Sequence, residues 1–125
     1  METNLDELRT TIDREVPGAL RVHFAGKSAS REAGKVLAPV FDDVLATAAG
    51  ERRTIECHFE RLEYFNSSTI AALVQFIRAA QRARVPITVV YDAKQRWQAM
   101  SFDALKRALR PFETGSSPAV RFAEV

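Results

Sequence analysis

The polar run Asn66-Ser67-Ser68-Thr69 stands directly before an apolar, helix-spaced segment that begins at Ile70. Asn and Ser are favoured helix N-caps because their side-chain oxygens accept orphan backbone N–H groups. A cap explains one of these residues and leaves the others unexplained. A helix N-terminus also carries about half a positive charge and free N–H groups, so it favours a phosphate. The run therefore predicts either a plain cap or a phosphorylation site.

Residues suited to catalysis or metal binding are few elsewhere in the chain. His23 and His58 lie in strand-like segments, on the polar side of each, and are predicted to be surface histidines dispersed from each other. Cys57 and His58 are neighbours on a strand, so their side chains point to opposite faces and cannot share a zinc ion. The sequence has neither a glycine-rich phosphate loop nor the serine elbow of hydrolases. We therefore expect no catalysis, no metal site and no cofactor.

Length and composition describe one ordinary globular domain. The chain has 125 residues, 46% hydrophobic and 27% charged, which is long enough for one core and too short for two. A single cysteine, an acidic and polar start (METNLDELRT) and the lack of long apolar runs favour a cytoplasmic protein that does not contact membranes. We expect a single domain over 1–125, with 1–9 as a flexible N-terminal segment, and a monomer or weak dimer.

Positive charge gathers between Gln75 and Arg110, where eight basic residues stand against Asp92 and Asp103. The net charge of the whole chain is only +2, so the remainder is acidic. A basic patch is compatible with nucleic-acid binding. Most of these charges occur at helical spacing between apolar positions, however, which is typical of solvated helix faces. We therefore expect no nucleic-acid partner.

Alternating apolar residues predict strands at 19–25, 54–59, 87–91 and 120–122, whereas 10–16 is compatible with either a strand or a helix. The turn signal Pro17-Gly18 favours a strand at 10–16 that forms a hairpin with 19–25. The strand–helix–strand unit over 54–91 predicts parallel strands with a right-handed crossover. The regular alternation of apolar and polar residues along these strands predicts that one face of the sheet is polar. The expected fold is α/β, with a mixed sheet of four or five strands and helices mainly on one face.

Helical spacing predicts helices at 30–49, from the polar run to Arg82, and at 96–109. In the first, Pro39 marks either a kink or the true start, and Gly50 supplies the stop. The second is predicted to begin between Asn66 and Thr69, with Asn66 or Ser67 as cap. A break at Ser101 is expected in the third, and a loop is expected at 115–118.

The stretch TIECHFERLEYFNSSTIAALVQFIRAAQRARVPITVVY, 54–91, resembles the core of the STAS domain of anti-sigma factor antagonists. In that core a strand and a short apolar segment lead into Asp-Ser-Ser-Gly at the head of a helix, and a valine-rich strand follows. The segment RWQAMSFDALKRAL, 96–109, is similar to the next helical segment of the family, and ALRVHFAGK to an earlier strand. Asn66 stands at the Asp position and Thr69 at the Gly position, a pattern that resembles the SiaC-type subset, which regulates a diguanylate cyclase.

The resemblance implies a single STAS-like domain that works by partner switching and catalyses nothing. The unphosphorylated form binds a GHKL-type serine/threonine kinase or anti-sigma factor, the kinase phosphorylates the domain, and a PP2C-type phosphatase restores the binding form. Ser67 matches the regulatory serine, with Ser68 as second choice, and the partner-binding run is Asn66, Ser67, Ser68 and Thr69. Two alternatives stay open: an unphosphorylated scaffold for another partner such as a diguanylate cyclase, and a small nucleotide-binding domain or enzyme.

Overall fold

The structure, a computed structural model, describes residues 2–5, 7–112 and 120–125. This part of the chain contains one six-stranded sheet, three α-helices and the short 3-10 helix η1 (Arg110–Phe112). The strands are β1 (Glu2–Leu5), β2 (Leu8–Asp13), β3 (Ala19–Ser28), β4 (Thr54–Phe65), β5 (Ile87–Tyr91) and β6 (Arg121–Glu124). The helices are α1 (Ala33–Glu51), α2 (Ser67–Arg82) and α3 (Arg96–Leu109).

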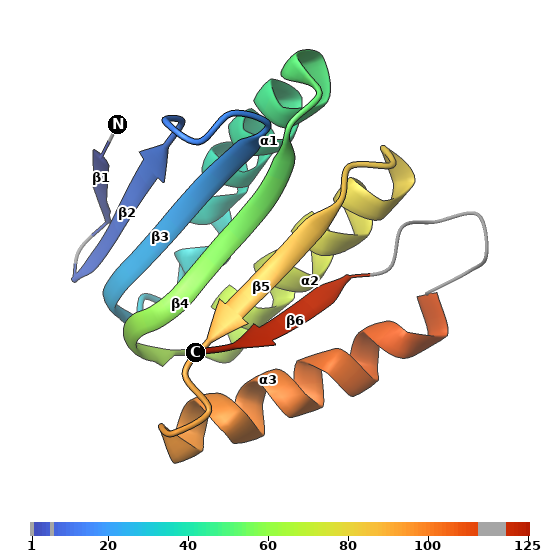
Figure 1. Ribbon diagram of the computed structural model, residues 1–125. Helices are drawn as coiled ribbons and strands as arrows, with labels where there is room; N and C mark the ends of the chain where they lie inside the picture. The colour runs from blue at the N-terminus through green and yellow to red at the C-terminus, as the bar shows by residue number, and fades with distance from the viewer. Residues whose placement is uncertain (1, 6, 113–119) are drawn as a thin grey trace.

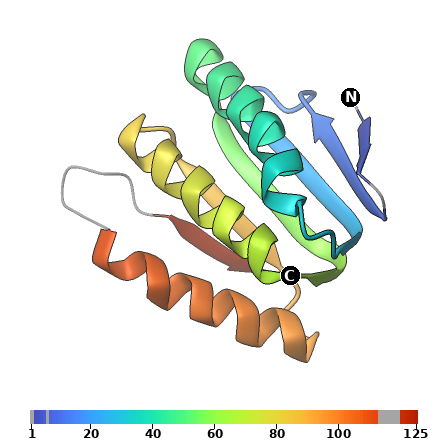
Figure 2. The same ribbon diagram turned by 180° about the vertical axis from the view of Figure 1, so that it is seen from behind.

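The sheet is mixed and its strands follow chain order (Figure 1). β1 and β2 are antiparallel, as are β2 and β3, whereas β3, β4, β5 and β6 are parallel. Parallel crossovers are almost always right-handed, and the strand order never reverses, so the helices between parallel strands fall on one face. Views from opposite sides show this arrangement (Figure 1, Figure 2). The expected mixed α/β architecture is confirmed, with one strand more than expected.

The additional strand is β1, which lies in the segment expected to be flexible. Its backbone pairs with β2, and β2 pairs in turn with β3. The predicted hairpin between β2 and β3 is thereby confirmed. Gly18 in the connecting turn has a φ of 79°, a conformation that glycine adopts without strain.

Helix α1 ends later than expected, and its start excludes one of the two interpretations of Pro39. It begins at Ala33, so Pro39 lies inside it and does not mark its start. Pro39 and Lys35 are both exposed, and water can therefore satisfy the Lys35 carbonyl that Pro39 leaves without a donor. The helix also continues through Gly50, and Arg52 takes the left-handed conformation with φ 56°. The N–H groups of Arg52 and Arg53 both donate to the Ala48 carbonyl, which closes the helix two residues later than expected.

Helix α3 runs without a break through Ser101, contrary to expectation. The reason is the fully buried Phe102, whose ring packs against Phe59 and Tyr91 with centroids 5.1 Å apart in each case. Unwinding the helix at Ser101 would remove this side chain from the core. The loop expected at 115–118 lies outside the described residues.

Strand β4 continues to Phe65, well beyond its expected end at Phe59. Gln98 of α3, a fully buried polar side chain, is hydrogen-bonded to this extension. Its Nε2 donates to the carbonyls of Phe59 at 2.7 Å and Leu62 at 3.0 Å, and its Oε1 accepts from the Asp92 N–H at 2.8 Å. The β3–β4 register shifts along this same stretch, and Gln98 supplies hydrogen-bond donors to two of its carbonyls.

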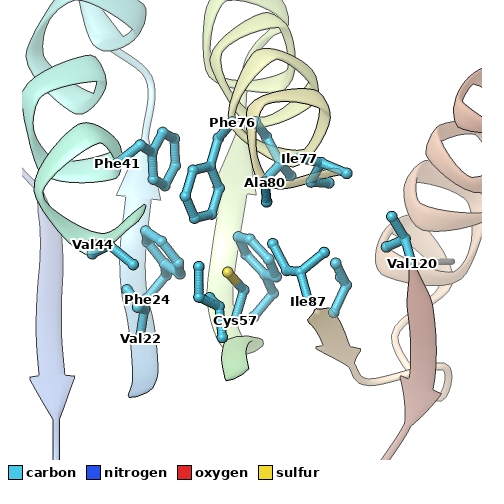
Figure 3. Close-up of a cluster of buried hydrophobic side chains, with 14 of the residues drawn as sticks. Val22, Phe24, Phe41, Val44, Cys57, Phe76, Ile77, Ala80, Ile87 and Val120 are labelled. Atoms are coloured by element: carbon cyan, nitrogen blue, oxygen red, sulfur yellow. The ribbon is translucent and has the colours of Figure 1, made fainter. Parts of the chain in front are cut away.

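The core lies between the sheet and the helices (Figure 3). Phe24 of β3 stacks on Phe59 of β4 at 4.8 Å between centroids, and Phe41 of α1 stacks on Phe76 of α2 at 4.4 Å. Such pairs add about 0.5–1.5 kcal/mol each to the burial of their area. None of the described helices is long and apolar enough to cross a membrane.

Candidate functional site

Asn66 links the end of β4 to the start of α2. Its backbone is extended, and its Oδ1 accepts hydrogen bonds from the Thr69 N–H at 3.0 Å and the Thr69 hydroxyl at 2.9 Å. Its Nδ2 donates to the Ser30 carbonyl at 2.8 Å. The predicted helix start is confirmed, with Asn66 as the cap. The same side chain fixes the loop that follows β3.

Thr69 faces the interior. It is 5% exposed, and its hydroxyl lies 2.6 Å from that of Ser28, the last residue of β3. The Asn66 N–H also donates to the Ser28 carbonyl at 3.0 Å. Thr69 therefore holds the polar run against β3 and has no surface to offer a partner.

Ser68 caps a different helix from its own. Its Oγ accepts a hydrogen bond from the Gly34 N–H at 2.9 Å, in the first turn of α1. The α1 N-cap residue, Glu32, makes no side-chain capping bond of its own. A Cβ added to Gly34 would lie 3.1 Å from the Ser68 Oγ, so the two helices approach closely here. The N-termini of α1 and α2 consequently converge on Ser68.

Ser67 is the first residue of α2 and is exposed. Its hydroxyl has no hydrogen-bond partner among the described residues. It lies at the N-terminus of α2 and beside Ser68, which is bonded to the N-terminus of α1, so the positive partial charge of both helix ends is near it. Of the three hydroxyl side chains in the polar run, only that of Ser67 combines exposure with an unengaged oxygen.

A groove of about 830 Å³ runs between α1 and α2 from this point. Ser68, at the head of α2, and Arg82, at its end, both line it, so it follows the length of that helix. Its apolar part includes Phe41, Leu45 and Phe76. Its charged lining residues are four basic and two acidic: Arg31, Lys35, Arg78, Arg82, Glu32 and Asp42.

The opposite sheet face brings together residues that the sequence reasoning kept apart. His23 and His58 both lie on this polar face and are partly exposed, as expected, but their rings stack with centroids 4.6 Å apart. The parallel register of β3 and β4 sets them side by side. The expectation that the histidines are dispersed was therefore wrong. Cys57 lies on the other face, where burial raises the pKa of its thiol to about 12.

Sequence reasoning missed the partners of the polar run, namely Ser28, Ser30 and Gly34. One signal was available, because the carboxyl ends of adjacent parallel strands meet at the same edge of a sheet. The serines that follow the strand at 19–25 and the run that follows the next strand were therefore candidates for contact. The contact with Gly34 had no comparable signal, since it depends on how closely two helices pack.

No protein-family model matches the sequence, and no curated protein matches it either. Solved structures do share its fold. SiaC, in the complex with the diguanylate cyclase SiaD that it activates in Pseudomonas aeruginosa, matches at 18% identity and a TM-score of 0.66, over 99% of this chain and 97% of that one. An anti-sigma factor antagonist from Mycobacterium paratuberculosis matches at 12% identity and a TM-score of 0.63, over 95% and 89%.

The phosphorylated form of SpoIIAA, a Bacillus cell fate determinant, matches at 13% identity and a TM-score of 0.56, over 83% of this chain and 99% of that one. At these identities the likeness establishes the fold. The chain has the SpoIIAA-like fold of STAS domains, as the resemblance of 54–91 implied.

Proposed function

We propose that this chain is a non-enzymatic signalling protein that binds a protein partner at Ser67 and the α1–α2 groove, and that phosphorylation of Ser67 releases the partner. The observation that carries this proposal is that the three hydroxyl groups of the polar run have different surroundings. Ser67 is exposed and unengaged, while Ser68 caps α1 and Thr69 is buried. A phosphate on Ser67 breaks no hydrogen bond of the described fold.

The charge of the groove supplies a mechanism for release. Its charged residues carry an excess of positive charge over an apolar floor, which suits a partner surface of apolar and acidic side chains. A phosphoserine adds about −1.5 to −2 charges at neutral pH. Placed beside Ser68 at the head of the groove, this charge offsets the positive excess and repels an acidic partner. The two helix N-termini stabilise the phosphate itself, so the fold persists.

The proposed partner is a GHKL-type serine/threonine kinase or anti-sigma factor, with a PP2C-type phosphatase that regenerates the binding form. The resemblance of the polar run to the STAS motif supports this choice. So does the fact that SpoIIAA, which shares the fold, has been solved in both unphosphorylated and phosphorylated forms. In this scheme Ser67 is the acceptor, and the chain itself transfers no phosphate.

The test combines the chain with ATP and each purified GHKL-type serine/threonine kinase of its source organism. We expect one of them to phosphorylate wild type and Ser68→Ala but not Ser67→Ala. The same kinase should bind unmodified chain and Ser67→Ala, and lose affinity for Ser67→Asp. Phosphate on Ser68, or ATP hydrolysis by the chain without a kinase, would contradict the proposal; the latter would favour the enzyme alternative.

A second candidate partner is a diguanylate cyclase. The observation that favours it is the likeness to SiaC, which spans nearly the whole of both chains. The corresponding test measures GTP turnover by the diguanylate cyclases of the source organism with and without the chain. Activation by wild type that Ser67→Asp abolishes would assign this partner. Equal activation by Ser67→Asp would instead indicate a scaffold that phosphorylation does not control.

A further inference from the structure

The open face of the sheet, opposite the helices, carries a second cluster of side chains that could bind a ligand. His23 on β3 and His58 on β4 are partners in the parallel register. Glu60 lies two residues beyond His58 on the same strand, so its side chain points to the same face. All three are partly exposed. Two imidazoles and a carboxylate are thus held on the central strands of the sheet.

The spacing of these groups suits a tetrahedral metal ion. His58 Nδ1 lies 3.2 Å from Glu60 Oε1 and 3.4 Å from Oε2. Two ligands bound tetrahedrally to zinc at their usual bond lengths are separated by about 3.3 Å. A nitrogen of His23 completes a set in which every ligand atom lies within 4.8 Å of the others. Binding of an ion would therefore require the His23 side chain to rotate, so that this third ligand reaches bonding distance.

Glu56 provides the support that a metal-bound histidine requires. Its Oε1 lies 3.2 Å from His58 Nε2, and Arg21 Nε lies 3.4 Å from the same oxygen. A neutral imidazole has one donor nitrogen, so it can donate to only one of the two carboxylates that flank His58. With a cation at Nδ1, the Nε2–H donates to Glu56 and Glu60 becomes a ligand. Carboxylates orient metal-bound histidines in this way.

We propose that His23, His58 and Glu60 form a binding site for a divalent transition metal, with zinc as the ion that best fits two imidazoles and one carboxylate. Magnesium and calcium favour all-oxygen ligand sets and suit this site poorly. Three protein ligands leave one coordination position for water or an added group. The site lies on the face opposite the α1–α2 groove, so it is independent of the proposed switch at Ser67.

The test is calorimetric titration of the tag-free chain with zinc chloride, together with NMR of the imidazole protons. The chain has only two histidines, both in the cluster, so the imidazole region reports on the site alone. We expect saturation at one zinc ion per chain and shifts of both histidine signals. Zinc should also raise the thermal midpoint, because it binds the folded chain in preference to the unfolded one.

His58→Ala and Glu60→Gln should each weaken zinc binding by about tenfold or more, and Glu56→Gln by about tenfold through the loss of His58 orientation. Glu63→Gln is the matched control, an exposed carboxylate on the same strand, and should bind zinc as wild type does. Thermal midpoints without zinc verify that each variant is folded. The absence of saturable binding by wild type would overturn the proposal. Equal binding by wild type and Glu60→Gln would also overturn it, because it would show association elsewhere.

Discussion

The Nδ2 of Asn66 donates a hydrogen bond to the carbonyl oxygen of Ser30 across 2.8 Å. The Thr69 N–H can only donate, so the Asn66 atom facing it is the oxygen, and the amide orientation follows. One side chain therefore caps α2 and holds the loop before α1. The aspartate that the STAS resemblance places at this position has no N–H for the second of these bonds.

Exchange of Asn66 for that aspartate should therefore destabilise the fold. In Asn66→Asp the new carboxylate keeps the cap but places an oxygen against the Ser30 carbonyl. We expect a loss of about 1–3 kcal/mol in the free energy of unfolding at neutral pH, measured by denaturant titration. The loss should shrink as the pH falls toward about 4, where the new carboxyl group protonates and regains a donor. A pH-independent loss, or none, would contradict the role assigned to the Nδ2 bond.

Substitutions of Ser67 and Ser68 should differ in their effect on the stability of the fold, because only Ser68 has a hydrogen-bond partner. Ser68→Ala removes the acceptor for the Gly34 N–H and should cost about 1 kcal/mol, as the loss of a helix cap does. Ser67→Ala removes an exposed hydroxyl and should change the free energy of unfolding by less than about 0.5 kcal/mol. Equal effects of the two substitutions in denaturant titrations would contradict the asymmetry on which Ser67 is chosen.

Gln98 should be essential to the extension of β4 that leads to the polar run. Gln98→Leu leaves the carbonyls of Phe59 and Leu62 and the N–H of Asp92 without their partner. We expect a loss of about 3 kcal/mol in the free energy of unfolding. Gln75→Leu, at an exposed position of α2, is the control and should be nearly neutral. A small loss in Gln98→Leu would show that this part of β4 holds its path without the glutamine.

The Cys57 thiol should be inert in the folded chain, because burial raises its pKa from 9.0 to about 12. A thiol reagent at pH 8 should modify it stoichiometrically in denaturant and hardly at all in buffer. A folded-state pKa above the unfolded value stabilises the fold below about pH 9, and this stabilisation is lost as the pH rises toward 12. The stability advantage of wild type over Cys57→Ala should therefore shrink above pH 9. An advantage that stays constant up to pH 11 would contradict this assignment.

Features that depend on local sequence were predictable. The Asn66 cap bonds to Thr69, which is three residues away, and the β2–β3 hairpin depends on the turn at Pro17-Gly18. Both features depend on residues that are close together in the chain, so a local sequence pattern can predict them. The continuity of α3 through Ser101 was mispredicted because the burial of Phe102 outweighs the local preference of a serine. The sequence left two interpretations of Pro39 open, and the start of α1 at Ala33 excludes the one in which Pro39 begins the helix.

Features that depend on register and packing were not predictable from the sequence. His23 and His58 are far apart in the chain, and only the parallel pairing of β3 and β4 stacks their rings. From the sequence, only the motif resemblance favours Ser67 over Ser68. The physical difference between the two serines is the bond of Ser68 to the Gly34 N–H, which requires the three-dimensional approach of α1 and α2. The burial of Gln98 has the same origin, since its partners belong to another element.

The measurement that tests the central claim most directly is the mass-spectrometric mapping of phosphate on the chain isolated from its own cells. Cells lacking their PP2C-type phosphatases should accumulate the modified form. The account predicts phosphate on Ser67, its loss in a Ser67→Ala strain and its persistence in a Ser68→Ala strain. Phosphate on Ser68, or an unmodified polar run across growth conditions in phosphatase-deficient cells, would contradict it and leave Asn66, Ser67, Ser68 and Thr69 as a helix cap alone.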